Sequence, residues 1–267
     1  MRFSLNDQHV SDFHSLGYTI FRAVLPPSLI RDLRQVCERG AALVRAKNGG
    51  NSQRFQPVAK FDLDQKPFEV YRDLPELKEA FATLLSPRHY HGDLNVLGVL
   101  IEPTERPWCT NWHRDLVHHD LDLTMATIPF YDLNLFNQIN CALYEDSSTW
   151  YVPGSHLRPE LPGEIAAMGG TIPAPGPNLE NLNAEEAEAR CNAYCHQMPG
   201  AIQMHLNAGD LAVYRAIGWH AGNYATYRKR ATLHDAVETP EYKAYRDGVY
   251  AAASKRKAAQ ALAAASR

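Results

Sequence analysis

One stretch of the chain, Trp108-Cys109-Thr110-Asn111-Trp112-His113-Arg114-Asp115, combines two metal-binding residue types at a spacing that suits a single ion. On a β-strand, residues i and i+2 point to the same face. His113 and Asp115 would then converge on one point, whereas Arg114 would face outward. The pair supplies two thirds of a 2-His-1-carboxylate triad, which binds ferrous iron and leaves other coordination positions open. Because H-x-D pairs are frequent by chance, the prediction needs a second histidine.

Two histidines compete for the third position, His156 and His220. A co-substrate such as 2-oxoglutarate would chelate the iron through its 2-oxo acid end and would need a cation at its far carboxylate. Arginine suits that role because its planar fork matches a carboxylate and stays charged when buried. Ten residues after His156 stands Ala166, and ten residues after His220 stands Arg230. This spacing favours His220 as the third ligand and Arg230 as the partner of the co-substrate.

These and neighbouring residues also fit other interpretations. The cluster Cys191-x-x-x-Cys195-His196 contains zinc-binding residue types, but no second ligand pair stands at the spacing of a structural zinc site. Taken one at a time, His113 and Asp115 fit a hydrogen-bonded surface pair, His220 fits a core histidine, and Arg230 fits a surface salt bridge of little energetic value. The combination and its order favour the iron site.

The elements that would position these residues fall into a helical front part and a β-rich core. Helices are predicted over residues 5–15, with Ser4 as N-cap, over 29–47 and over 75–85, with a short strand at Tyr18–Phe21. Further strands are predicted at residues 94–101, 134–144, 149–152, 201–206, 211–215 and 230–237. Many short strands separated by turn signals indicate a β-sandwich or barrel with the early helices packed outside.

We expect one domain over residues 1–267, with a mostly helical part at 1–90, the β core at 91–237 and a C-terminal helix at 238–267. Residues 158–200 are rich in proline and glycine and interrupt the core as a long loop, with a short acidic helix near 184–194. A loop of this length in a compact domain is either a functional lid or disordered. Both alternatives stay open at this point.

Composition limits the class of protein. The formal net charge of −3 gives no electrostatic footprint for nucleic acid. No apolar run is long enough to span a bilayer, and the first residues lack the apolar core of a signal peptide. The five cysteines are odd in number and scattered, as expected of reduced thiols. These features predict a cytoplasmic protein that acts on a small molecule, with no nucleic-acid or membrane partner.

Taken together, these motifs resemble the phytanoyl-CoA dioxygenase family of Fe(II)- and 2-oxoglutarate-dependent oxygenases. The resemblance runs from about Leu5 to Val237 and includes Trp112-His113-Arg114-Asp115, the Pro153-Gly154-Ser155-His156 turn, Gly209-Asp210, and His220-x-Gly222-Asn223 followed by Arg230. It implies a mainly β fold with flanking helices around a double-stranded β-helix, or jelly roll.

The resemblance also implies a set of site residues. Iron would bind His113, Asp115 and His220, and the 2-oxoglutarate tail would bind Arg230. The histidine of the Pro-Gly-Ser-His turn is not a ligand in such proteins. A polar residue on the strand before that turn often reaches the co-substrate. Asn140 is the candidate here, and Asn137 and Gln138 are its competitors.

The sequence also departs from the pattern of the family. Gly222 stands where a serine often assists the arginine, which would remove one contact to the co-substrate. The segment between Asp146 and Pro153 is shorter than usual and lacks the expected glycine. Nothing in the chain suggests an acyl-CoA site.

Three functions fit these features. The first is hydroxylation of an unactivated C–H bond of a metabolite or natural-product intermediate, which consumes O2 and releases succinate and CO2. An aspartate at 115 favours this over halogenation, since related halogenases have a small residue there. The second is desaturation, epoxidation or cyclisation with the same cofactors, and the third is a non-catalytic metal-binding jelly roll. Substrate recognition is expected from Gln53-Arg54-Phe55, from the region of His118-His119-Asp120, interpreted as a loop near the mouth, and from residues 158–200.

Overall fold

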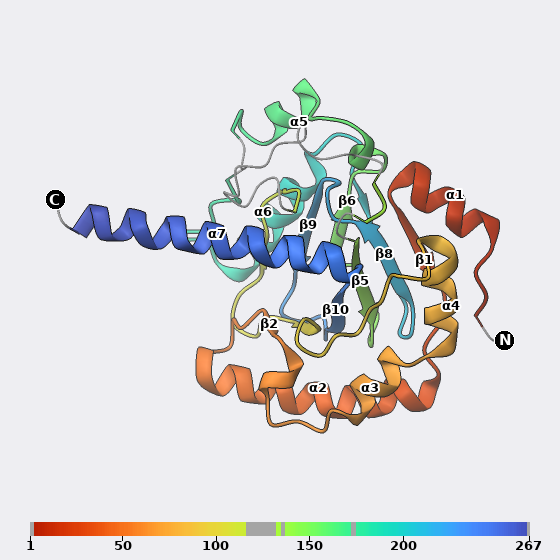
Figure 1. Cartoon of the computed structure of the whole chain (residues 1–267). Helices are drawn as coiled ribbons and strands as arrows, with labels where there is room; N and C mark the ends of the chain where they lie inside the picture. Colours follow the sequence, from red (N-terminus) through yellow and green to blue (C-terminus); the bar gives the residue numbers. More distant parts are fainter. Residues whose placement is uncertain (1–2, 116–131, 135–136, 172–174, 266–267) are drawn as a thin grey trace.

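The protein, described here from a computed structural model over residues 3–115, 132–134, 137–171 and 175–265, is built on short β-strands with helices around them (Figure 1). The strands are β1 (Tyr18–Phe21), β2 (Arg54–Phe55), β3 (Gly98–Ile101), β4 (Trp108–Cys109), β5 (Asn137–Ala142), β6 (Thr149–Tyr151), β7 (Ile202–Gln203), β8 (Leu211–Arg215), β9 (His220–Tyr224) and β10 (Ala231–Val237). They form an antiparallel six-stranded sheet in the order β1-β8-β5-β10-β3-β2 and an antiparallel four-stranded sheet in the order β4-β9-β6-β7. The predicted mainly β fold, a jelly-roll core with flanking helices, is confirmed.

The period of two along the strands of the larger sheet separates a hydrophobic core from a polar interior. Ile139 and Cys141 of β5 and Leu233 of β10 are fully buried in the main core. Gln138 and Asn140, which alternate with the core residues along β5, point to the other face, toward the smaller sheet, and line a cavity. Because successive side chains of a strand alternate between its faces, one set of strands serves both purposes.

Two predicted strands begin later than expected because aspartate side chains accept backbone N–H groups that would otherwise pair with a neighbouring strand. At residues 94–101, the side chain of Asp93 accepts a hydrogen bond from Asn95 N at 2.9 Å, which forms a turn and delays β3 to Gly98. At residues 134–144, Asp132 accepts from Asn134 N at 2.8 Å in the same way. Strand β9 was not predicted, since its sequence His-Ala-Gly-Asn-Tyr has little intrinsic β-propensity.

The front of the chain folds into helices α1 (Asp7–Leu16), α2 (Pro27–Asn48), α3 (Lys66–Arg72) and α4 (Pro75–Leu84), with a 3-10 turn at Val58–Lys60. The N-cap of α1 is Asn6 rather than the predicted Ser4. The Asn6 side-chain oxygen accepts a hydrogen bond from the backbone N–H of His9, and the backbone N–H of Asn6 donates to His9 Nδ1. The two residues thus form a reciprocal capping box. Helix α3 was not predicted. Helices α2, α3 and α4 pack their buried apolar residues into the main core.

The segment expected to lack regular structure contains two helices, α5 (Pro162–Ala167) and α6 (Ala184–His196). The acidic helix was predicted, but α5 was not. Pro162 begins it, and the buried Glu164 accepts the backbone N–H of Leu161 at 2.9 Å and pairs with Arg158 at 2.6 Å. Proline at the first position of a helix and a carboxylate over its open N–H groups favour this helix.

The chain ends in the long helix α7 (Pro240–Ala265), which crosses the body of the protein and extends beyond it (Figure 1). Its position is that of the predicted C-terminal helix. No helix in the described part of the chain is both long enough and apolar enough to cross a membrane.

Candidate metal centre

His113, Asp115 and His220 come together at one point between the two sheets. Asp115 Oδ1 lies 3.6 Å from His113 Nε2 and 3.9 Å from His220 Nε2. One ligand atom from each residue lies within 4.8 Å of those of the others, and among the described residues these are the three whose side chains could surround a metal ion. Two imidazoles and one carboxylate are the donor set of non-haem iron sites. The residues therefore fit the ion that the sequence predicts.

Both imidazoles are oriented by their own neighbouring backbone. His113 Nδ1 lies 2.8 Å from the carbonyl oxygen of Asn111, and His220 Nδ1 lies 2.9 Å from that of Gly218. A carbonyl only accepts, so each Nδ1 carries a proton and each Nε2 presents a lone pair, as a metal ligand must. The backbones of His113 and His220 also bridge each other through two hydrogen bonds of 3.1 Å.

Asp115 reaches the same point without the regular strand that the sequence predicts. Strand β4 ends at Cys109, and beyond the His113 bridge the backbone turns so that Asp115 N donates to the carbonyl of Ala216 at 2.8 Å. On the side away from the histidines, Asp115 Oδ2 accepts a hydrogen bond from Gln138 Nε2. Gln138 Oε1 in turn accepts from the Tyr214 hydroxyl at 2.6 Å.

Tyr214 fixes the direction of this chain of hydrogen bonds. Burial, followed by the charge of Asp115, raises the pKa of Tyr214 well above its usual value, so the phenol stays protonated and donates. The amide of Gln138 must then present its NH2 to Asp115. Sequence reasoning missed Tyr214 and considered Gln138 only as a co-substrate contact. The sequence signal that could have identified them is their alternation with core residues, Gln138 on β5 and Tyr214 on β8.

Arg114 contradicts the prediction that it faces outward. Its side chain is fully buried, and Nη1 donates to the carbonyls of Ser155 and Ile217 at 2.8 and 2.9 Å. Its Nε lies 3.3 Å from Glu160, and the guanidinium lies over the ring of Trp219. Alternation does turn Arg114 away from the metal ligands, but protein covers that side. The arginine thus ties the segment that carries two ligands to the turn before the third.

His156 lies outside the cluster of His113, Asp115 and His220. It belongs to the 3-10 turn Ser155–Leu157, and its Nε2 donates to the carbonyl of His14 at 3.1 Å. The ring is buried, and burial, followed by the charge of Arg215, lowers the pKa of His156 to about 4. The cysteine cluster gives no alternative metal site within the described residues, where Cys191 and Cys195 are free thiols and His196 packs edge-on against Trp150.

Arg230 lies in the same cavity as the three candidate ligands and is 4% exposed. Its Nε donates to Asp146 Oδ2 at 2.9 Å, and its backbone N–H donates to Glu102 Oε2 at 2.7 Å. Burial is the largest single influence on the pKa of Arg230 and lowers it, but Asp146 and Tyr224 together outweigh burial and raise that pKa. Arg230 Nη1 is buried and has no hydrogen-bond partner among the described residues. An unused buried donor of this kind fits an anionic ligand.

Of the three polar candidates on β5, Asn140 and Gln138 line the cavity and Asn137 does not. Asn140 Nδ2 donates to Thr149 Oγ1 at 2.8 Å, and its Oδ1 accepts from His234 Nδ1 at 2.9 Å. Burial lowers the pKa of His234 to about 3, so the ring is neutral and its Nε2 carries a lone pair. A direct contact of Asn140 with a co-substrate stays a prediction.

The cavity has a volume of about 320 Å³ and receives side chains from both sheets and from α7. Arg54 lines it, as predicted, whereas Phe55 does not, because its ring packs on Gly40 in the core. Tyr250 of α7 also lines it and was missed, since the C-terminal helix was interpreted as a solvated end. The predicted mouth residues His118, His119 and Asp120 lie outside the described residues.

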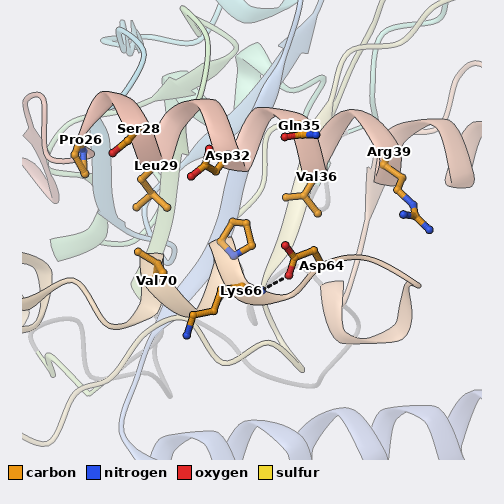
Figure 2. A pocket seen from close by; sticks show the side chains of 11 residues that line it. Pro26, Ser28, Leu29, Asp32, Gln35, Val36, Arg39, Asp64, Lys66 and Val70 are labelled. Carbon is orange, nitrogen blue, oxygen red and sulfur yellow. Dashed lines mark hydrogen bonds between the residues drawn. The ribbon is translucent and has the colours of Figure 1, made fainter.

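A second cavity, away from the metal centre, lacks this chemistry. A groove of about 450 Å³ lies between α2 and α3. Leu29 lies opposite Val70 and Val36 opposite Asp64, which accepts from the backbone N–H of Lys66 at 3.0 Å (Figure 2). Neither histidine nor cysteine lines it. It shares no residue with the cavity of the metal centre.

Several solved structures have a fold similar to that of this protein. It is similar to AviO1 from Streptomyces viridochromogenes Tue57, with a TM-score of 0.57 and 17% identity over 87% of this chain and 94% of that chain. It is also similar to the non-heme alpha ketoglutarate dependent carbocyclase SnoK from nogalamycin biosynthesis, with a TM-score of 0.51 and 19% identity over 87% and 83%. A third is the epimerase SnoN in complex with Fe3+, alpha ketoglutarate and nogalamycin RO, with a TM-score of 0.55 and 15% identity over 87% and 83%.

Neither a protein-family model nor a curated protein matches the chain. The resemblance to the phytanoyl-CoA dioxygenase family therefore stays a prediction at the level of the family. The protein has the fold of structures that include non-heme alpha ketoglutarate dependent enzymes.

Proposed function

We propose that the protein is a non-haem Fe(II)- and 2-oxoglutarate-dependent dioxygenase that hydroxylates an unactivated C–H bond of a small-molecule metabolite or natural-product intermediate. The observation that carries the proposal is the convergence of His113, Asp115 and His220 in a cavity that also holds a buried arginine. When bound, ferrous iron, 2-oxoglutarate and O2 supply the oxidising power, and succinate and CO2 are released.

Each residue then has a defined task. The two imidazoles and the carboxylate would hold iron from one side, which leaves its other positions for the co-substrate, O2 and the approach of the substrate. Gln138 keeps Asp115 in place, and Arg230 Nη1 donates a hydrogen bond to the far carboxylate of 2-oxoglutarate. The walls from both sheets limit access of water to the reacting atoms.

Anaerobic spectroscopy tests this assignment. Purified protein with Fe(II) and 2-oxoglutarate is expected to show a weak visible charge-transfer band, because the co-substrate chelates the iron. The band should disappear in His113→Ala and in Arg230→Ala and persist in His205→Ala, which removes an exposed histidine. Absence of the band in the wild-type protein with both ligands present would reject the enzyme and favour the non-catalytic metal-binding jelly roll.

A second outcome of the same chemistry is desaturation, epoxidation or cyclisation. The neighbours of known fold include a carbocyclase and an epimerase, so this fold accommodates reactions other than hydroxylation. A metabolite screen that follows succinate release would find the substrate, and mass spectrometry of the product would then decide. Gain of one oxygen atom supports hydroxylation or epoxidation, whereas loss of two hydrogens supports desaturation or ring closure.

A further inference from the structure

Gly222 and Tyr224 of β9 share one space beside Arg230. A Cβ atom at position 222 would lie 2.3 Å from the hydroxyl oxygen of Tyr224 and 2.7 Å from its Cζ. The tyrosine thus folds back along its own strand and places its hydroxyl where a side chain at 222 would stand. Residues 222 and 224 both line the metal cavity.

The ring of Tyr224 is fixed from both sides. On β4, Trp108 is its cross-strand partner and stacks on it with centroids 4.2 Å apart and an angle of 19° between the planes. The guanidinium carbon of Arg230 lies 4.7 Å from the ring centroid. Stacking and cation–π contacts of this kind each contribute to holding an aromatic ring in one orientation. The hydroxyl position is therefore set by the fold.

Tyr224 and Arg230 each bring a hydrogen-bond donor to the metal cavity. The guanidinium of Arg230 lies over the ring of Tyr224, and since a guanidinium only donates, it cannot accept the proton of the Tyr224 hydroxyl. The O–H proton of Tyr224 is then available to donate into the cavity. Arg230 Nη1 is a second donor without a partner among the described residues. Two adjacent donors match the two oxygens of a carboxylate.

The pairing of Arg230 with Asp146 makes the second donor more important. Asp146 is 5% exposed and accepts from Arg230, from Thr232 Oγ1 and from the backbone of Ser148. The buried pair carries no net charge, so an incoming carboxylate gains less from long-range attraction than it would from an unpaired arginine. Its binding must depend more on direct hydrogen bonds.

We propose that Tyr224 is a co-substrate-binding residue whose hydroxyl, together with Arg230 Nη1, binds the far carboxylate of 2-oxoglutarate. Gly222 is required because any side chain there would displace that hydroxyl. The contact expected to be lost at position 222 is thereby supplied from position 224. This inference rests on the proposed function, since it assigns a residue to the same co-substrate.

Binding measurements with two 2-oxo acids test the role of Tyr224. The protein is loaded anaerobically with Fe(II) and titrated with 2-oxoglutarate or with 2-oxobutyrate, which chelates the metal in the same way but lacks the far carboxylate. Tyr224→Phe keeps the ring and removes the hydroxyl. It is expected to raise the Kd for 2-oxoglutarate about 10- to 100-fold, the usual effect of losing a hydrogen bond to a charged group. The Kd for 2-oxobutyrate should not change.

Tyr227→Phe is the matched control. Its hydroxyl bonds Glu188 on the surface, and the side chain is 67% exposed, so both Kd values should equal those of the wild type. Gly222→Ala should weaken 2-oxoglutarate binding as Tyr224→Phe does, because its methyl group displaces the tyrosine.

The outcomes separate the two proposals. If Tyr224→Phe binds 2-oxoglutarate as tightly as the wild type, or if it loses both 2-oxo acids equally, the role of Tyr224 is wrong while the proposed function stands. If the iron-loaded wild type binds neither 2-oxo acid, the proposed function itself fails.

Discussion

The two ends of the cavity are positioned by different kinds of contact. At the metal end, His113 and His220 are oriented by carbonyl oxygens two residues earlier in the chain. At the other end, Arg230 is held by Asp146, a buried charged partner 84 residues away. A neutral contact within the local chain orients a side chain without placing a charge inside the protein. A buried ion pair fixes its partners equally well, but each charge then depends on the other.

The difference predicts how each end responds to substitution. Removal of a metal ligand should abolish iron binding and leave the fold nearly intact, because no buried charge loses its partner. Removal of Arg230 should damage both the co-substrate site and the fold.

The largest expected effect on stability is that of Arg230→Met. It leaves the carboxylate of Asp146 buried and unpaired, which should lower the free energy of unfolding by about 3–5 kcal/mol. Urea denaturation of the metal-free protein measures this, with His113→Ala as the comparison from the metal end.

The double variant Arg230→Met/Asp146→Leu provides the control. It removes both charges and should recover most of the lost stability, since an apolar pair of similar volume often replaces a buried ion pair without loss. Equal stability of Arg230→Met and the wild type would show that the two ends do not differ as described.

An intermediate effect is expected at Gln138, where the metal end does use a remote partner. Gln138→Leu removes the donor to Asp115 and should weaken Fe(II) binding about 10- to 100-fold, the usual cost of losing an outer partner of a ligand. Competition with a metal chelator measures the affinity. Gln203→Leu, whose amide donates to the Ser147 carbonyl outside this cavity, is the control. Unchanged affinity in Gln138→Leu would mean that Asp115 is positioned by its backbone alone.

The smallest effect concerns the histidine that does not join the metal centre. The pKa of His156 is lowered to about 4 in the folded protein, against ~6.5 when unfolded, so the folded state disfavours the proton. Its contribution to stability is present above the unfolded pKa and is lost as the pH falls toward the folded pKa. Between the folded pKa of about 4 and the unfolded pKa of ~6.5, His156→Gln should reduce the slope of the free energy of unfolding against pH by about 1.4 kcal/mol per pH unit.

Urea denaturation across this pH range gives the slope, and Fe(II) titration of the same variant gives metal affinity. An unchanged slope would contradict the buried neutral state of His156. Loss of iron binding would return His156 to the list of candidate ligands.

Local patterns were enough to predict much of this molecule. The spacing of His113 and Asp115 and the separation of ten positions from His220 to Arg230 identified the residues that meet in the cavity. Apolar periodicity identified α2 and α4, and β-rich runs identified most strands. These features are readable because each depends on residues close together in the sequence.

Other features were missed because their causes are distant. Strand β9 exists because β4 and β6 pair with it on both sides, despite its glycine and asparagine. Arg114 is buried because carbonyls from residues 155 and 217 receive it. Neither cause can be seen within a few residues of the element that it affects.

The sequence alone therefore determined which residue types are available for iron and co-substrate chemistry and in what order they occur. Tertiary structure decided how they are supported: Gln138 behind Asp115, Asp146 beside Arg230, and Tyr224 in the space left by Gly222. The physical reason is the distance along the chain over which each kind of interaction acts. A motif records which atoms can bind, whereas burial, ion pairing and shared space arise only when distant segments pack together.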